Sequence, residues 1–220
     1  MQDSAVRKIP FCLPLIDKDV NQEVFSCLNE TGWLTTGPQV KLLEDEITKL
    51  CHTRSAICVN SWTSGMLLLI RWLNLSEDDE IIVPTYTYAA SALSVINSGV
   101  KCVFVDVNSD FTININEVEK AITENTKAIM PVDLGGLPAD YKALNSLLSK
   151  ESVRSKFISK TDFQRKIGRP IIISDAAHSI GSLIDGLPAP LFSDFSVFSF
   201  HSVKNITTGE GGAITFKIFD

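Results

Sequence analysis

Short apolar runs alternate with segments of helical pattern along most of the chain. The runs that predict strands are 55–59, 80–84, 101–107, 127–132, 170–177, 194–200 and 211–216. The segments that predict helices are 63–73, 89–97, a stretch from the Asn114–Glu117 capping box to about 122, and one that begins near Asp140. Nearly continuous apolar strands separated by helices are typical of a mainly parallel sheet covered on both faces. The pattern therefore predicts an α/β fold.

Residues 149–169 form the one basic, polar segment of the chain. Such a run of charged residues is usually a solvated face. We expect an extended surface helix and a loop here.

The composition is that of an ordinary globular protein, with 45% hydrophobic and 21% charged residues. A net charge of −6, without any Lys/Arg-rich run, argues against nucleic-acid binding. The longest apolar run, 66–70, is too short to span a bilayer, and the N-terminus lacks the pattern of a secretory signal. The five cysteines are scattered, which favours reduced thiols over disulfides or zinc ligands. We expect a cytoplasmic protein that has no membrane segment, metal or nucleic-acid partner.

Candidate chemistry lies in loops at the carboxyl ends of the predicted strands, where parallel sheets bind their ligands. The loop after 55–59 places Thr63 and Ser64 at the start of a predicted helix. Unpaired N–H groups and the helix dipole make such a start suitable for a phosphate. Serine and threonine also serve there as plain N-caps, and the residues alone leave both interpretations open. Neither dinucleotide-binding nor P-loop glycine motifs occur.

Asp175 stands at the end of the apolar run that begins at Pro170, and His178 follows three residues later. A carboxylate at the end of a buried strand needs a partner, because desolvation alone raises its pKa. Asp175 either belongs to a site or caps a following helix, with His178 packed beside it.

Lys204 follows the apolar run 194–200 and precedes a Gly-Glu-Gly-Gly turn. An isolated lysine is usually a surface cation, but this one comes directly after a predicted buried strand. A lysine nucleophile must lose its proton, and partial burial lowers its pKa from about 10.4. An anion site, a carboxylate and a lysine together are the groups that a pyridoxal 5′-phosphate (PLP) enzyme needs.

Five fragments, in order along the chain, resemble the DegT/DnrJ-type family of PLP-dependent sugar aminotransferases. They are TGWLTTGPQVKLLEDEI, VNSWTSGMLLLIRWLNLSEDDEIIVPTYTYAASALSVINSGVKCVFVDV, KAIMPVDLGGLPAD, SDAAHSIGS and FSFHSVKNITTGEGGAI. The resemblance implies the large domain of the fold-type I architecture, a mainly parallel sheet flanked by helices. It also implies PLP as the cofactor.

The resemblance implies roles for three residues around the reactive part of the cofactor. Lys204 would be the catalytic lysine that forms the Schiff base with PLP. Asp175 would pair with the pyridine nitrogen, and His178 would lie beside the phenolic oxygen.

The remaining implied contacts hold the phosphate and the ring. Thr63 and Ser64 would bind the phosphate at the helix start, joined by Ser199. Tyr88, in the fragment PTYTY, would stack on the pyridine ring, with a place in the hydrophobic core as its alternative role.

Members of the family pass an amino group from glutamate to a keto-sugar nucleotide and act as homodimers with interfacial active sites. The resemblance therefore implies an aminotransferase of polysaccharide or glycoconjugate biosynthesis, with a nucleotide-sugar substrate and an amino-acid donor. A related PLP-dependent sugar dehydratase is one alternative, although those relatives carry histidine in place of the lysine. A non-catalytic remnant of the fold is the other.

Three features depart from the family pattern. Asp133 stands where many relatives carry histidine, in a segment expected to contact the substrate. The segment before Asp175 is longer than usual, in keeping with a basic insertion at 149–169. The sequence ends at Asp220, where relatives continue into a smaller C-terminal domain. We expect residues 1–220 to form a PLP-binding large domain with an N-terminal arm.

Overall fold

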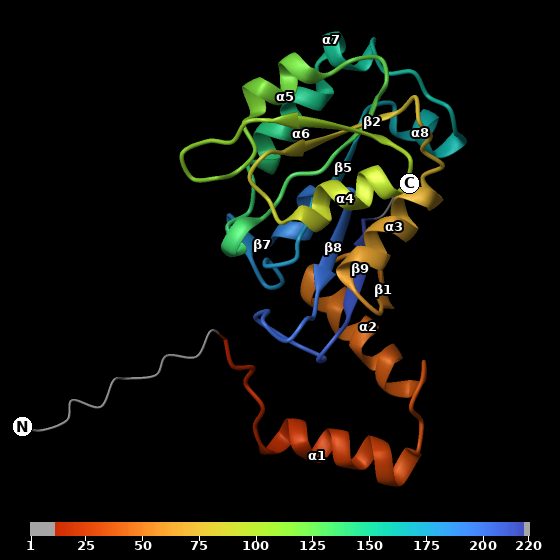
Figure 1. Cartoon of the computed structure of the whole chain (residues 1–220), viewed down its shortest axis with the longest axis vertical. Coiled ribbons are helices and arrows are strands. Elements are labelled where there is room, and N and C mark those ends of the chain that lie inside the picture. The colour runs from red at the N-terminus through yellow and green to blue at the C-terminus, as the bar shows by residue number, and fades with distance from the viewer. Residues whose placement is uncertain (1–11, 218–220) are drawn as a thin grey trace, which may run out of the picture.

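Seven strands form one twisted sheet in the computed structural model, which describes residues 12–217 (Figure 1). Their bounds are β1 Ser55–Val59, β2 Glu80–Pro84, β3 Lys101–Val105, β4 Thr126–Ile129, β5 Ile171–Asp175, β8 Phe195–Ser199 and β9 Gly212–Phe216. The order across the sheet is β1-β9-β8-β5-β4-β2-β3. Strands β8, β5, β4, β2 and β3 are parallel, and β9 is antiparallel to both of its neighbours. The predicted mainly parallel sheet is confirmed.

Helices cover both faces of this sheet, and one further helix, α1, lies apart from it (Figure 1). The bounds of the helices are α1 Lys18–Ser26, α2 Pro38–Cys51, α3 Trp62–Trp72, α4 Ala89–Asn97, α5 Ile115–Ala121, α6 Tyr141–Ser149, α7 Glu151–Arg154 and α8 Asp162–Ile167. Shorter elements are the helical turns η1 Cys27–Thr31, η2 Leu134–Gly136 and η3 Ala189–Phe192, and the hairpin β6 Leu183–Ile184 and β7 Leu187–Pro188. The helix predicted at 89–97 coincides with α4, and α3 lies one residue before the predicted 63–73.

The predicted capping box at the start of α5 forms only in part. The Asn114 side chain accepts hydrogen bonds from the N–H groups of Asn116 and Glu117, as an N-cap should. The Glu117 carboxylate instead accepts from Lys120, and the Asn114 N–H donates to the carbonyl of Asp106. The cap is thus made by asparagine, and the glutamate serves a surface ion pair.

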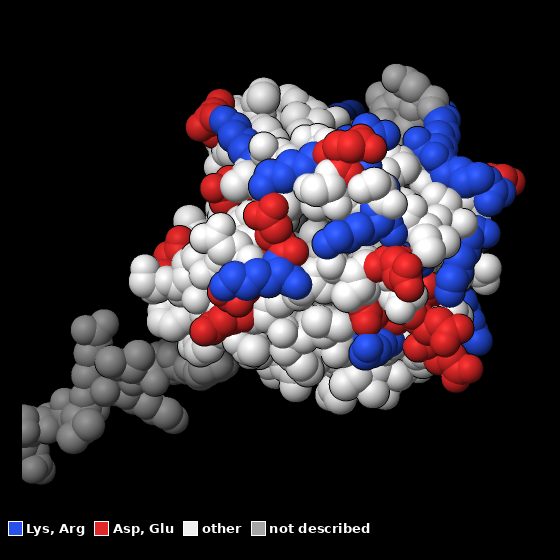
Figure 2. Space-filling view, turned by 90° about the horizontal axis from the view of Figure 1, so that it is seen from above, with Lys and Arg blue, Asp and Glu red and all other residues white. Residues whose placement is uncertain are grey.

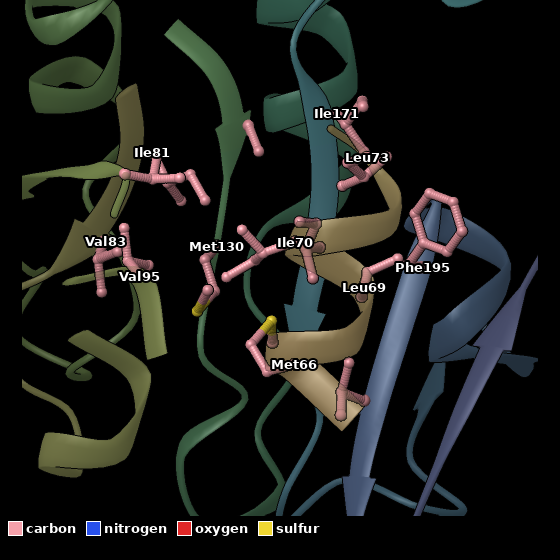
Figure 3. Packing of buried hydrophobic residues seen from close by; sticks show 14 of the residues in the cluster. Met66, Leu69, Ile70, Leu73, Ile81, Val83, Val95, Met130, Ile171 and Phe195 are labelled. Carbon is pink, nitrogen blue, oxygen red and sulfur yellow. The ribbon is translucent and has the colours of Figure 1, made fainter. Parts of the chain in front are cut away.

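Side chains alternate across the central strands, so these strands are buried on both faces. On β2, Ile81 and Val83 belong to one hydrophobic cluster and Ile82 to another. The first face is covered by α3, α4 and α8, and Figure 3 shows Met66 and Ile70 of α3 in its packing. The second face is covered by α5 and α6, with α2 beside β1, β8 and β9.

The basic segment 149–169 forms the two short helices α7 and α8 joined by a loop, so the prediction of one extended surface helix is wrong. Val153 in α7 and Gln164 in α8 are buried and turn the segment inward. The Lys160 ammonium lies 2.8 Å from the carboxylate of Asp79, which is fully buried. The segment therefore covers the amino-terminal edge of the sheet.

The first described elements lie apart from the sheet, at the foot of Figure 1. Within the described residues, α1 buries none of its side chains, and the aromatic ring of Phe25 is exposed. The chain then turns at Gly32 and enters α2, which packs on β1 and β9.

Charged side chains of both signs are interspersed on the face seen in Figure 2, and neither sign gathers into a single patch there. Among the helices within residues 12–217, none combines the length and the apolar character needed to cross a membrane.

Candidate active site

A cleft of about 470 Å³ opens at the carboxyl ends of the parallel strands. The loops after β1, β2, β4, β5 and β8 all contribute to its walls. The predicted site residues that line it are Thr63, Tyr88, Asp175, His178, Ser199 and Lys204. The loops after 55–59, 170–177 and 194–200, which carry the candidate chemistry, therefore meet in one cleft.

Helix α3 begins beside the cleft, with Ser61 as its N-cap. The Ser61 hydroxyl accepts a hydrogen bond from the Ser64 N–H at 3.1 Å and lies 2.8 Å from the Ser64 hydroxyl. The Ser64 hydroxyl also donates to the side chain of Asn60 and lies outside the cleft lining. Thr63 is exposed in the cleft. The helix start thus offers Thr63 and its first-turn N–H groups to an anion, while Ser64 is engaged in the cap.

Gly212, the first residue of β9, permits this arrangement. A Cβ atom at Gly212 would lie 2.6 Å from the carbonyl oxygen of Phe198 and 2.9 Å from backbone atoms of Ser61 and Trp62. Any larger residue would push the strand away from the first turn of α3. The close approach of β9 therefore determines the position of the first turn of α3.

Asp175 is the last residue of β5 and is only 5% exposed. Its carboxylate accepts hydrogen bonds from the Ser91 hydroxyl at 2.7 Å and from the Ala177 N–H at 3.2 Å. Burial raises the pKa of Asp175 to about 6; the charge of Asp133 adds to the rise, while the hydrogen bonds and Lys204 oppose it. The next element in the described chain is β6, so the alternative that Asp175 caps a helix is wrong.

Lys204 and His178 meet across the cleft. The Lys204 Nζ lies 2.7 Å from His178 Nε2, and His178 Nδ1 accepts a hydrogen bond from the Gly135 N–H at 3.2 Å. Partial burial lowers the pKa of Lys204, against the opposing charge of Asp175. Partial burial also lowers the pKa of His178, and the Lys204 charge lowers it further. Both groups are therefore biased toward their neutral forms, as a nucleophilic lysine requires.

The loop that carries Lys204 is held by one backbone hydrogen bond and by the side-chain amide of Asn205. The Lys204 N–H donates to the carbonyl of His201 at 2.9 Å, and the Asn205 amide donates to the carbonyl of Ile180 at 3.0 Å. The loop is thereby tied to the segment that carries His178.

Ser199 and Tyr88 lie on two further walls of the cleft. Ser199 ends β8, and its hydroxyl accepts a long hydrogen bond of 3.4 Å from the His201 N–H. Tyr88 precedes α4 and is 82% exposed, so its alternative role as a core aromatic is wrong. A planar ring so exposed at the mouth of the cleft is free to stack on a ligand.

Asp133 borders the cleft, but its carboxylate is engaged inside the protein. It is 2% exposed and accepts hydrogen bonds from Tyr141, Ser174 and Ser179 hydroxyls and from the Ala139 N–H. These bonds occupy both of its oxygens. Asp133 therefore serves the local architecture at a position where the sequence suggested a substrate contact.

Sequence reasoning missed the groups that orient Asp175 and His178. Ser91 bonds to Asp175, and Thr87 lies 2.7 Å from the Ser91 hydroxyl. Two hydroxyls four residues apart at a strand-to-helix junction were a signal that could have been used. The Gly135 N–H is a backbone group, and no residue type marks it.

Comparisons with known proteins show which family the chain belongs to. The model of the DegT/DnrJ/EryC1/StrS aminotransferase family matches residues 14–155 and 163–217. The chain therefore belongs to this family, whose members depend on PLP. Residues 156–162, between the matched ranges, lie within the segment predicted to be an insertion.

Solved structures of similar proteins share the fold. The chain is 40% identical to the putative sugar aminotransferase Spr1654 from Streptococcus pneumoniae in its PLP form, with a TM-score of 0.92, over 96% of this chain and 54% of that one. It is 30% identical to Helicobacter pylori PseC, an aminotransferase involved in the biosynthesis of pseudoaminic acid, with a TM-score of 0.84, over 96% of this chain and 53% of that one. These neighbours confirm the fold-type I architecture.

Among curated proteins, the spore coat polysaccharide biosynthesis protein SpsC of Bacillus subtilis is 32% identical over 94% of this chain and 49% of its own length. The chain spans about half the length of the curated relatives that it matches.

The cleft fits PLP. The cofactor carries a phosphate, a ring nitrogen and an aldehyde, and the start of α3, Asp175 and Lys204 offer a matching group to each. Among the described residues, the direct hydrogen-bond donors to Asp175 are the neutral groups of Ser91 and Ala177. A protonated ring nitrogen would supply the cation that a buried carboxylate needs.

Proposed function

We propose that this protein is a PLP-dependent aminotransferase that transfers an amino group, with glutamate as donor, to a nucleotide-linked keto-sugar in polysaccharide or glycoconjugate biosynthesis. The observation that carries the proposal is the position of Lys204. Its Nζ lies 2.7 Å from His178 Nε2, in the cleft that Asp175 also lines. The names of the relatives support the substrate class, since they include sugar aminotransferases and a polysaccharide biosynthesis protein.

Each residue has a role that follows from its surroundings. Lys204 would hold the aldehyde of the cofactor and move the proton during transfer, because its partial burial favours the neutral amine. Asp175 would keep the ring nitrogen protonated, and His178 would orient the Lys204 amine. Bound PLP supplies an electron sink and a carrier for the amino group.

The remaining contacts hold the cofactor in place. Thr63 and the first N–H groups of α3 would bind the phosphate, with Ser64 shaping the turn and Ser199 on the opposite wall. Tyr88 would stack on the ring. We further propose a homodimer in the cytoplasm; the scattered cysteines support the compartment.

The test is transfer of labelled nitrogen. The protein is incubated with PLP, ¹⁵N-glutamate and a panel of keto-sugar nucleotides, and the products are read by mass spectrometry. We expect one ¹⁵N-amino sugar and an equal amount of 2-oxoglutarate, both lost in Lys204→Ala. A dehydrated sugar without ¹⁵N would identify a dehydratase, a class present among the structural neighbours. PLP binding without any product would favour the non-catalytic alternative.

A further inference from the structure

The turn of residues 133–136 lies against the cleft and contacts His178. Gly135 adopts a φ of +62°, within the left-handed region that favours glycine, and its N–H points at His178 Nδ1. Gly136 approaches the same segment, since a Cβ there would lie 3.2 Å from the carbonyl oxygen of His178. The turn and the His178 segment are therefore closely fitted.

This hydrogen bond determines which ring nitrogen of His178 carries the proton. A nitrogen that accepts an N–H bond has its lone pair engaged and carries no hydrogen. In the neutral ring the proton must then be on Nε2, which lies 2.7 Å from the Lys204 Nζ. The opposite tautomer would place two N–H groups, of Gly135 and Nδ1, against each other.

The tautomer in turn constrains Lys204. An ammonium group has three donors and no lone pair, so it cannot accept from the Nε2–H of a neutral His178. A neutral amine has the lone pair that this contact requires. Among residues 12–217, the charge that opposes this state at Lys204 is that of Asp175. The contact at 2.7 Å is therefore satisfied by an unprotonated lysine.

Asp133 anchors the turn at its base. Its Oδ1 accepts from the Ala139 N–H at 3.0 Å and from Tyr141 at 2.8 Å, which fixes the far end of the turn. Its Oδ2 accepts from Ser179 at 2.7 Å and from Ser174 at 3.2 Å, which fixes the strand and loop that carry His178. One buried carboxylate thus joins the donor and the acceptor of the Gly135–His178 bond.

We propose that Asp133 is a positioning residue, which holds the 133–136 turn so that His178 stays in its Nε2–H form and Lys204 stays an unprotonated amine. The inference deepens the proposed function, because an unprotonated lysine is what attack on the cofactor aldehyde needs. The geometry itself does not depend on any substrate.

The first test is the tautomer of His178 in protein without PLP, read from long-range ¹H–¹⁵N spectra. The sequence has three histidines, and His178→Gln assigns the signal. We expect wild type to show one protonated nitrogen at Nε2, and Asp133→Asn to show a mixture of tautomers. Asp140→Asn is the matched control, since Asp140 caps α6 from the same loop and asparagine caps equally well.

The second test is the titration of Lys204, read as the pH dependence of its acetylation by acetic anhydride with mass spectrometry. We expect the Lys204 midpoint to lie below that of the exposed lysines and to move up toward about 10.4 in Asp133→Asn. Asp140→Asn should leave the midpoint unchanged.

A wild-type His178 protonated at Nδ1 would overturn the proposal whatever the variants do. So would a folded Asp133→Asn protein with both the wild-type tautomer and the wild-type Lys204 midpoint. If Asp133→Asn does not fold, Ser179→Ala, which removes one donor, is expected to give the same changes to a smaller extent, and unchanged signals in it would equally overturn the proposal. Neither measurement uses PLP or a sugar, so a failed transfer assay with an intact Nε2–H signal would reject only the proposed function.

Discussion

Asp175 shows how a single residue in this fold is prepared for a cofactor. Its carboxylate is buried at the end of β5 and held by neutral donors, so its charged form is costly. The pKa of about 6 expresses this cost. The burial that destabilises the charged carboxylate when no cation is nearby would favour a cationic ring nitrogen beside it.

The free-energy cost of burying the charged Asp175 carboxylate can be measured with the variant Asp175→Asn in the protein without PLP. The folded-state pKa, about 6, lies above the unfolded value of about 3.9, so the folded state binds more protons between these values and stability falls as pH rises through them. Removing the charge should therefore raise the free energy of unfolding by about 1–3 kcal/mol at pH 8 and leave it nearly unchanged at pH 4.

Urea unfolding of wild type and Asp175→Asn at the two pH values checks this, with the exposed Asp140→Asn as control. Equal differences at pH 4 and pH 8, or a loss of stability at pH 8, would contradict the assigned burial cost. Transamination should nevertheless fall by orders of magnitude in Asp175→Asn, because an amide cannot keep the ring nitrogen protonated.

At the residue scale, the sequence predicted the charged groups that meet in the cleft and missed the neutral groups that orient them. Asp175 and Lys204 stand out because a charge directly after an apolar strand needs an explanation. Ser91 and the Gly135 N–H do not stand out, since serine is common at helix starts and every residue has a backbone N–H. Their roles depend on contacts between residues far apart in sequence. The Thr87–Ser91 spacing is a local signal for a pair of hydroxyls, but it does not identify Asp175 as their partner.

The loops between strands and helices position the site at the next scale. Gly212 lets β9 pass beside the first turn of α3, where the phosphate of the cofactor is proposed to bind. We expect Gly212→Ala to weaken PLP binding by at least tenfold, because the added methyl group displaces that turn. A tenfold loss corresponds to about 1.4 kcal/mol.

The control is Gly65→Ala, also in contact with the sheet but farther along α3. A Cβ there would meet the side chains of Val59, Val197 and Ile214 at 3.1–3.3 Å, so it should affect stability more than PLP binding. Fluorescence titration with PLP gives both affinities. An unchanged affinity in Gly212→Ala would remove the start of α3 from the phosphate site.

The loop between α7 and α8 contributes to stability at the opposite edge of the sheet. Lys160 pairs with the buried Asp79 and reaches the Ser76 hydroxyl at 3.3 Å. Lys160→Ala should lower the free energy of unfolding by about 1–3 kcal/mol, because the buried carboxylate loses a charged partner. Lys156→Ala, at an exposed position of the same loop, should change it by less than about 0.5 kcal/mol. Thermal unfolding of both variants measures these changes in stability. Equal losses of stability in Lys160→Ala and Lys156→Ala would contradict a stabilising role of the Lys160–Asp79 pair.

At the element scale, hydrophobic periodicity predicted the seven strands of the large sheet and the helices α3, α4, α5 and α6, since the spacing of apolar positions is a local property. It did not predict α1 or α2. The prediction of an extended surface helix in 149–169 was wrong. The segment is polar overall, and its composition gives no indication that Val153 and Gln164 are buried. The strand order, with β9 inserted antiparallel between β1 and β8, arises from long-range pairing that hydrophobic patterns do not encode.

For the whole molecule, the described residues 12–217 contain every group that is proposed to bind PLP. The curated relatives are about twice as long as the region that they match. We expect the 220-residue chain to bind PLP with a dissociation constant on the order of micromolar. Equilibrium binding, followed by fluorescence, checks this value, and the absence of saturable binding up to about 1 mM PLP would contradict it.

The central claim is that Lys204 is the residue that carries PLP. The most direct measurement is reduction of the PLP-loaded chain with sodium borohydride, followed by proteolysis and mass spectrometry. The account predicts a single stable adduct on Lys204 in wild type, and no adduct in Lys204→Ala, which should still fold because the residue lies in a loop and is only half-buried. An adduct on another lysine, or an unmodified Lys204 after reduction, would contradict it.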